Sequence, residues 1–101
     1  MSKKIITILL VAGLSNSSNA YGISEAVCNN HKMVMYTVIS WRNSGIPIQT
    51  AKDVFDHEDN YELLFFLRKV VKDVYKNPVA GKDYLDAGFF TKKCIEIHRG
   101  Y

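Results

Sequence analysis

Hydrophobic side chains recur along much of the chain at the three- and four-residue spacing of an amphipathic helix. This spacing predicts four helices, over residues 24–43, 47–56, 61–76 and 83–98. Alternation of apolar and polar residues, the pattern of a half-buried strand, never lasts beyond a few residues. The chain is therefore predicted to be all-α, a small up-down helical bundle of three long helices and one short helix.

The apolar positions of these helices define the expected core. The predicted core-facing residues are Val27, His31, Val34, Val38 and Trp41 in the first helix, Leu63, Leu67, Val70, Val71 and Val74 in the third, and Phe90, Cys94 and Ile97 in the fourth. Three lysines, Lys69, Lys72 and Lys76, fall on the opposite face of the third helix. That helix is thus expected to pack with one face and meet solvent with the other.

Turn and capping residues mark the ends of the first three helices. Ser24 is a suitable N-cap for the first helix, and Gly45 is expected to end it with a positive φ. Pro47 then opens the short second helix. Asp59 or Asn60 is suited to cap the third helix, because both side chains accept hydrogen bonds from backbone N–H groups.

The fourth helix is expected to follow a turn. The Asn77-Pro78 pair ends the third helix, because proline disfavours helical geometry at the residue before it. Residues 79–82 are predicted to form the turn, and Asp83 to begin the fourth helix, with Asp86 completing a capping box.

The first twenty residues have the pattern of a secretory signal peptide rather than of a folded element. Lys3 and Lys4 precede an apolar run over residues 5–14, and Ser18 and Ala20 supply the small residues of a cleavage site. The apolar run is shorter than the roughly 20 residues that span a bilayer, so no stable membrane anchor is expected. A buried N-terminal helix is the alternative. Cleavage after Ala20 predicts one helical domain over residues 21–101, periplasmic or secreted.

Composition and charge narrow the classes of partner. The 101 residues are 48% hydrophobic and 23% charged, which is typical of a folded domain and not of a disordered chain. Removing Lys3 and Lys4 from the 13 basic residues leaves 11 against 10 acidic ones. Because neutralisation of phosphates supplies much of the affinity for nucleic acid, a nucleic-acid partner is not expected.

Cys28 and Cys94 are the two cysteines, near the two ends of the predicted domain. In an exported protein they predict a structural disulfide, worth about 4 kcal/mol on the chain-entropy estimate. The alternatives are a redox pair, which usually has Cys-x-x-Cys spacing, and a metal site, which needs more ligands at closer spacing. In an up-down bundle the start of the first helix and the end of the last lie together, which agrees with the bridge.

No constellation of catalytic or cofactor-binding residues is found, and neither a metal nor a cofactor is predicted. His31, on an apolar face, is predicted to be buried and hydrogen-bonded rather than a ligand. His57-Glu58 begins like a zinc-protease motif but lacks the second histidine four residues later. His98, close to the end of the chain, is expected to be solvated.

Charge is segregated along the sequence. Five carboxylates and no Lys or Arg occupy residues 53–62, whereas four basic residues and one Asp occupy residues 68–76. A hydrolase carboxylate pair and a calcium loop are both disfavoured for this acidic segment. It is either ordinary solvated surface or a loop presented to a basic partner. The predicted partner-binding residues are Asp53, Asp56, Glu58, Asp59 and Glu62.

Paired aromatic residues point to exposed apolar surface. Phe65 and Phe66, like Phe89 and Phe90, are neighbours on predicted helices, where adjacent side chains point about 100° apart. One member of each pair must therefore leave the core. Exposed aromatic side chains are typical of a partner site or a dimer interface.

The order of features resembles a widespread group of small, exported, disulfide-bridged helical bacterial proteins, to which no activity is attached. The resemblance is carried by Cys28, the Arg42-Asn43-Ser44-Gly45-Ile46-Pro47 helix break, Ala51, the Val74-Tyr75-Lys76-Asn77-Pro78 segment and Cys94. The chain is also similar, in general plan only, to small periplasmic immunity proteins that neutralise secreted effectors.

The function predicted from these features is a non-enzymatic exported protein that binds or inhibits a protein partner in the cell envelope. One alternative is a small-ligand carrier or minor enzyme with a pocket between the helices near His31. Another is a homodimer formed through exposed aromatic side chains.

Overall fold

The computed structural model describes residues 16–100, which form five helices and no strand. The helices are α2 (Asn16–Asn43), α3 (Ile48–Asp53), α4 (Tyr61–Lys76), α5 (Pro78–Asp86) and α6 (Phe89–Arg99). The predicted all-α class is therefore confirmed. The apolar run over residues 5–14 lies outside the described residues, and the cleavage predicted after Ala20 falls within α2.

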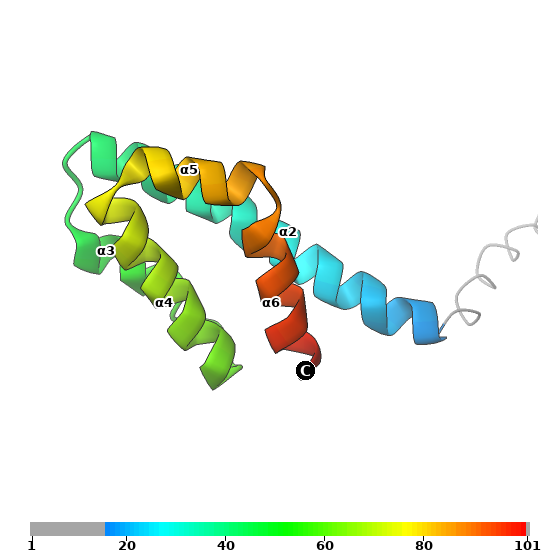
Figure 1. Cartoon of the computed structure of the whole chain (residues 1–101). Helices are drawn as coiled ribbons and strands as arrows, with labels where there is room; N and C mark the ends of the chain where they lie inside the picture. Colours follow the sequence, from blue (N-terminus) through cyan, green and yellow to red (C-terminus); the bar gives the residue numbers. More distant parts are fainter. Residues whose placement is uncertain (1–15, 101) are drawn as a thin grey trace, which may run out of the picture.

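The long helix α2 is the element against which most of the others pack. α6, α5, α4 and α3 all contact α2, and α6 also contacts α4 and α5. In Figure 1, α4 and α6 both extend away from the same side of α5, with α2 running behind α5. The core joins all five helices; its buried members are Cys28, Met35, Val38, Ala51, Phe55, Leu63, Leu64, Leu67, Val70, Val71, Val74, Leu85, Phe90 and Cys94.

The faces predicted for α4 are confirmed. All five of its predicted core residues are buried, whereas Lys69, Lys72 and Lys76 are exposed. Asn60 caps the helix, as one of the two predicted candidates, because its Oδ1 accepts a hydrogen bond from the Leu63 N–H at 3.0 Å. Phe65 is 75% exposed.

The end of α2 is also as predicted. The helix ends at Asn43, and Gly45 has a φ of 85°. The Ile46 N–H donates to the carbonyl of Trp41 at 2.9 Å, which closes the turn. Tyr75 of α4 donates its hydroxyl proton to the Ile46 carbonyl at 2.7 Å and so holds the turn against the neighbouring helix.

The prediction for the fourth helix is wrong, because two helices occupy that part of the chain. Residues 79–82 are not a turn but belong to α5, and Asp83 is an interior residue of that helix. Pro78 is the first residue of α5, where a missing N–H costs nothing, and the Asn77 side chain accepts from the Ala80 N–H at 3.1 Å. The helical run breaks instead at Gly88, whose φ of 87° is left-handed.

The predicted start of the first helix is wrong too. α2 begins before Ser24, which is an interior residue with only 2% of its surface exposed. Its hydroxyl shares a hydrogen bond of 2.7 Å with Nδ1 of His98, so His98 is half-buried and not solvated as predicted. The N-cap prediction failed because α2 already begins at Asn16, and the prediction for His98 failed because its partner lies 74 residues away in the sequence.

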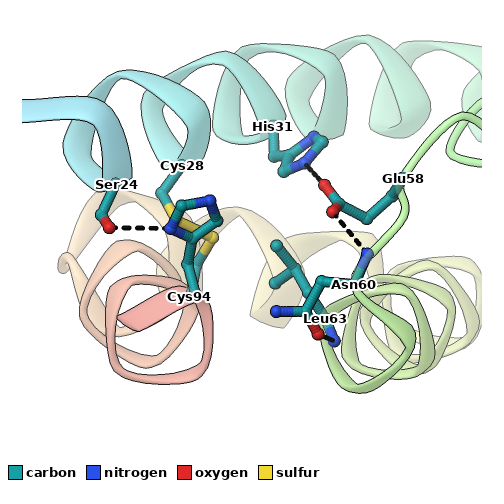
Figure 2. A network of polar contacts seen from close by, with 8 residues as sticks. Ser24, Cys28, His31, Glu58, Asn60, Leu63 and Cys94 are labelled. Carbon is teal, nitrogen blue, oxygen red and sulfur yellow. Dashed lines mark hydrogen bonds and ion pairs between the residues drawn. A yellow bond between two sulfur atoms is a disulfide. The ribbon is translucent and has the colours of Figure 1, made fainter. Parts of the chain in front are cut away.

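The predicted disulfide between Cys28 and Cys94 is present, and neither cysteine is free. It ties α6 to α2 across a sequence separation of 66 residues, and both half-cystines are fully buried. Figure 2 shows the bridge beside Ser24 on the same helix. None of the helices in residues 16–100 combines the length and the apolar character that crossing a membrane requires.

Candidate functional site

A groove of about 710 Å³ lies between α4, α5 and α6. Its floor is apolar and aromatic and consists of Phe66, Val70, Val74, Ala80, Gly81, Tyr84 and Phe89. Its edges are charged and consist of Lys69 and Asp73 on α4 and Lys92, Lys93 and Glu96 on α6. We call this feature the α4–α6 groove. Its volume lies in the range of about 300–1,000 Å³ that is common for binding sites.

Close packing of α4 on α5 brings Gly81 against Val74 in the lining of the groove. Gly81 faces Val74, and a Cβ atom on Gly81 would lie 2.6 Å from Val74 Cγ2. Only glycine therefore allows the two helices to approach this closely. Asn77 sets the angle between them, because its backbone N–H caps α4 and its side chain caps α5.

Aromatic stacking and the disulfide fix the position of α6, which forms the side of the groove opposite α4. Phe89, the first residue of α6, stacks on Tyr84 of α5 with ring centroids 6.2 Å apart. Phe90 is buried and stacks on Phe66 of α4 at 5.5 Å. Because Cys94 ties the same helix to α2, α6 is held from both of its sides. The pair Phe89 and Phe90 divides between surface and core, as predicted.

The charged edges are partly neutralised within each helix. Lys69 forms an ion pair with Asp73 at 3.2 Å, and Lys93 forms one with Glu96 at 4.0 Å. Burial, followed by the negative charge of Asp73, raises the pKa of Tyr84 above its ordinary value. The Tyr84 hydroxyl is therefore neutral at physiological pH and contributes a polar tip to an aromatic floor.

Glu58 is the partly buried carboxylate of the acidic segment. This side chain turns inward and accepts a hydrogen bond from His31 Nε2 at 2.8 Å and one from the Asn60 N–H at 3.0 Å (Figure 2). His31 is buried and hydrogen-bonded, as predicted, and its ring meets the edge of Phe55. Partial burial acts to raise the pKa of Glu58, but the hydrogen bonds from Asn60 and His31 outweigh it and lower the pKa.

Two further carboxylates of the segment have partners nearby. Asp56 pairs with Arg68 of α4, and Asp53 accepts a hydrogen bond from Gln49 at 2.9 Å. Asp59 and Glu62 are exposed. Of the five predicted partner-binding residues, the fold thus uses Glu58 to position its own loop and leaves the other four at the surface.

The α4–α6 groove was missed by the sequence reasoning. The groove lies between α4 and two helices, α5 and α6, that were not predicted separately. The sequence predicted a turn over residues 79–82 and a single helix over residues 83–98 in their place. The one available signal was the Phe89-Phe90 pair, which required one exposed aromatic ring at this point. The groove lining does not include His31, beside which an alternative pocket was predicted.

Within residues 16–100, no group of three or more His, Cys, Asp and Glu side chains is arranged to hold a metal ion. No known protein family, curated protein or solved structure matches the chain. The geometry of the α4–α6 groove and of the acidic segment therefore carries the functional argument.

Proposed function

We propose that this chain is a non-enzymatic protein of the periplasm or extracellular space that binds a partner protein through the α4–α6 groove. The proposal includes the finer arrangement of the fold, an up-down bundle in which the part of α2 around Ser24 and Cys28 lies beside α6. The bridge between Cys28 and Cys94 supports that arrangement. An inhibitory role is consistent with this proposal, because small immunity proteins are likewise exported, helical and disulfide-bridged.

The exposure of Phe89 is the observation on which the proposal rests. Phe89 is 61% exposed although it stands at the start of a helix whose next residue, Phe90, is fully buried. Tyr84 stacks on the Phe89 ring, and both aromatic side chains belong to the apolar floor. Aromatic side chains held in this way on concave apolar surface contribute most of the binding energy in many interfaces.

The acidic segment is proposed as a secondary contact of the same partner. Asp53, Asp59 and Glu62 remain exposed and can steer a basic surface during association. Glu58 is excluded from this role because its carboxylate is already bound to His31 and Asn60.

The second candidate function is that of a small-ligand carrier. Its ligand site would be the α4–α6 groove and not the region of His31. This candidate is favoured by the volume of the α4–α6 groove and by its apolar floor. The groove lining contains no serine, cysteine or histidine, and its charged side chains are lysines and carboxylates.

Site-specific photo-crosslinking tests the proposed function in the cells that make the protein. A benzoylphenylalanine residue replaces Phe89 in one variant and Met33 in a matched control. Met33 lies on α2, outside the groove lining, and is also 61% exposed. We expect a discrete protein adduct from position 89 and none from position 33. Identical adducts at both positions, or none at position 89, would contradict the proposal.

A further inference from the structure

Lysine side chains stand along both edges of the α4–α6 groove. Lys69, Lys72 and Lys76 follow one another on α4 at spacings of three and four residues, which places them on one stripe of the helix. Lys69 belongs to the groove edge itself. Lys92 and Lys93 stand on the opposite edge, in the first turns of α6.

The acidic residues at the groove do not balance these lysines. Asp73 and Glu96 each have a lysine partner on their own helix. No ion pair in residues 16–100 involves Lys72, Lys76 or Lys92. The groove lining therefore carries three lysines against two carboxylates, and Lys92 is its unpaired charge. Lys72 and Lys76 lie outside the lining and extend the lysine stripe of Lys69 along α4. The complement of an apolar floor with this positive excess is an apolar stripe flanked by carboxylates.

The length of the floor fits two turns of a helix. The floor residues of α4 run from Phe66 to Val74, which corresponds to about 12 Å along the helix axis. Apolar residues at i, i+3, i+4 and i+7 of a bound helix extend over about 10 Å. One such set of side chains would occupy the floor and contact the stacked rings of Phe89 and Tyr84 where α5 meets α6.

We propose that the α4–α6 groove binds an acidic amphipathic helix of the partner protein, apolar face inward and carboxylates toward the lysines of both edges. This inference rests on the proposed function and names the class of partner. A fatty acid matches the groove less well, because it carries a single charge at one end whereas the lysines line both sides. Recognition of this kind places a helix in a groove through its i, i+3, i+4 and i+7 side chains.

Binding of designed peptides to the oxidised protein tests the inference. The probe is a fluorescently labelled peptide of about four helical turns, with leucine at i, i+3, i+4 and i+7 and glutamate on both flanks. A matched peptide carries lysine in place of each glutamate, and palmitate serves as a third ligand. We expect the acidic peptide to bind about tenfold or more tightly than the basic one at low salt. Added salt should reduce this preference.

Charge reversal on the protein provides the second arm. Lys92→Glu should weaken binding of the acidic peptide by about threefold or more, because it reverses one unpaired charge at the edge. Lys52→Glu changes the net charge equally on α3, outside the groove lining, and should leave binding unchanged. Phe89→Ser should weaken both peptides together.

The outcomes separate the inference from the proposed function. Equal or tighter binding of the basic peptide, still lost in Phe89→Ser, would overturn the acidic helix and retain the groove as the partner site. Binding of palmitate without either peptide would overturn both in favour of a lipid carrier. Binding of neither peptide by a protein that sediments as a dimer would assign the groove to a second copy of the chain and overturn the inference.

Discussion

Replacement of Gly81 by alanine gives a direct test of the close packing of α4 and α5 in the groove lining. An added Cβ would lie 2.6 Å from Val74 Cγ2 and 3.3 Å from Val74 Cα, so both the side chain and the backbone of α4 stand in its way. Overpacking of this kind costs about 1–3 kcal/mol. Alanine in a helix interior regains about 1 kcal/mol over glycine. The expected net loss in the free energy of unfolding is about 1 kcal/mol.

Thermal and urea unfolding followed by circular dichroism measure this loss, which corresponds to a fall in Tm of about 4–8 °C for a domain of this size. Gly22→Ala is the control, because it is also helical and nothing lies within 4 Å of its added Cβ. The control should be neutral or stabilising. In a Val74→Ala background, which removes the clashing methyl, Gly81→Ala should cost at least about 0.5 kcal/mol less. Stabilisation by Gly81→Ala in the wild-type background would refute the close approach of the two helices.

Three other predictions concern the capped turn, the partly buried Glu58 and the disulfide. Gly45→Val should lower the free energy of unfolding by about 1 kcal/mol or more in urea titrations, because its φ of 85° strains any residue with a Cβ although the surrounding space is open. Glu58→Gln should cost about 1–3 kcal/mol at pH 6, measured against the exposed control Glu62→Gln. Because the pKa of Glu58 is lowered in the folded protein, the contribution of its charge is present above the ordinary glutamate pKa. This contribution is lost as pH falls through the lowered pKa, so Glu58→Gln should destabilise the protein less at pH 3 than at pH 6. A larger destabilisation at pH 3 would contradict a stabilising role for the Glu58 charge. Thiol titration of denatured, unreduced protein should find no free thiol, and Cys28→Ser should destabilise by about 4 kcal/mol, as should Cys94→Ser.

Local signals in the sequence predicted the features that depend on neighbouring residues. The five apolar positions of α4 follow one helical face, Gly45 precedes a proline by two residues, and Asn60 stands directly before a helical run. Each of these is determined within a few residues by spacing, backbone freedom or hydrogen-bonding capacity. The disulfide was predictable because only one pairing exists.

The features that sequence reasoning missed depend on contacts between distant residues or on an ambiguous local signal. Asn77-Pro78 ends one helix and starts the next, and the same two residues are compatible with a turn. Ser24 is a good N-cap by type, but its hydroxyl instead meets His98, 74 residues away. Nothing in the acidic segment distinguished Glu58 from its neighbours, although His31 on an apolar face indicated that a hydrogen-bond partner was needed.

The affinity of the cross-linked partner for two variants of this protein tests the central claim most directly. Phe89→Ser removes the exposed ring of the α4–α6 groove, and a triple reversal of Asp53, Asp59 and Glu62 to lysine alters the acidic surface without touching Glu58. If the groove is the principal binding surface, the Kd should rise about tenfold or more in Phe89→Ser. The same Kd should rise only about threefold in the triple variant. An unchanged Kd in Phe89→Ser together with loss of binding in the triple variant would contradict the account and assign the partner to the acidic segment.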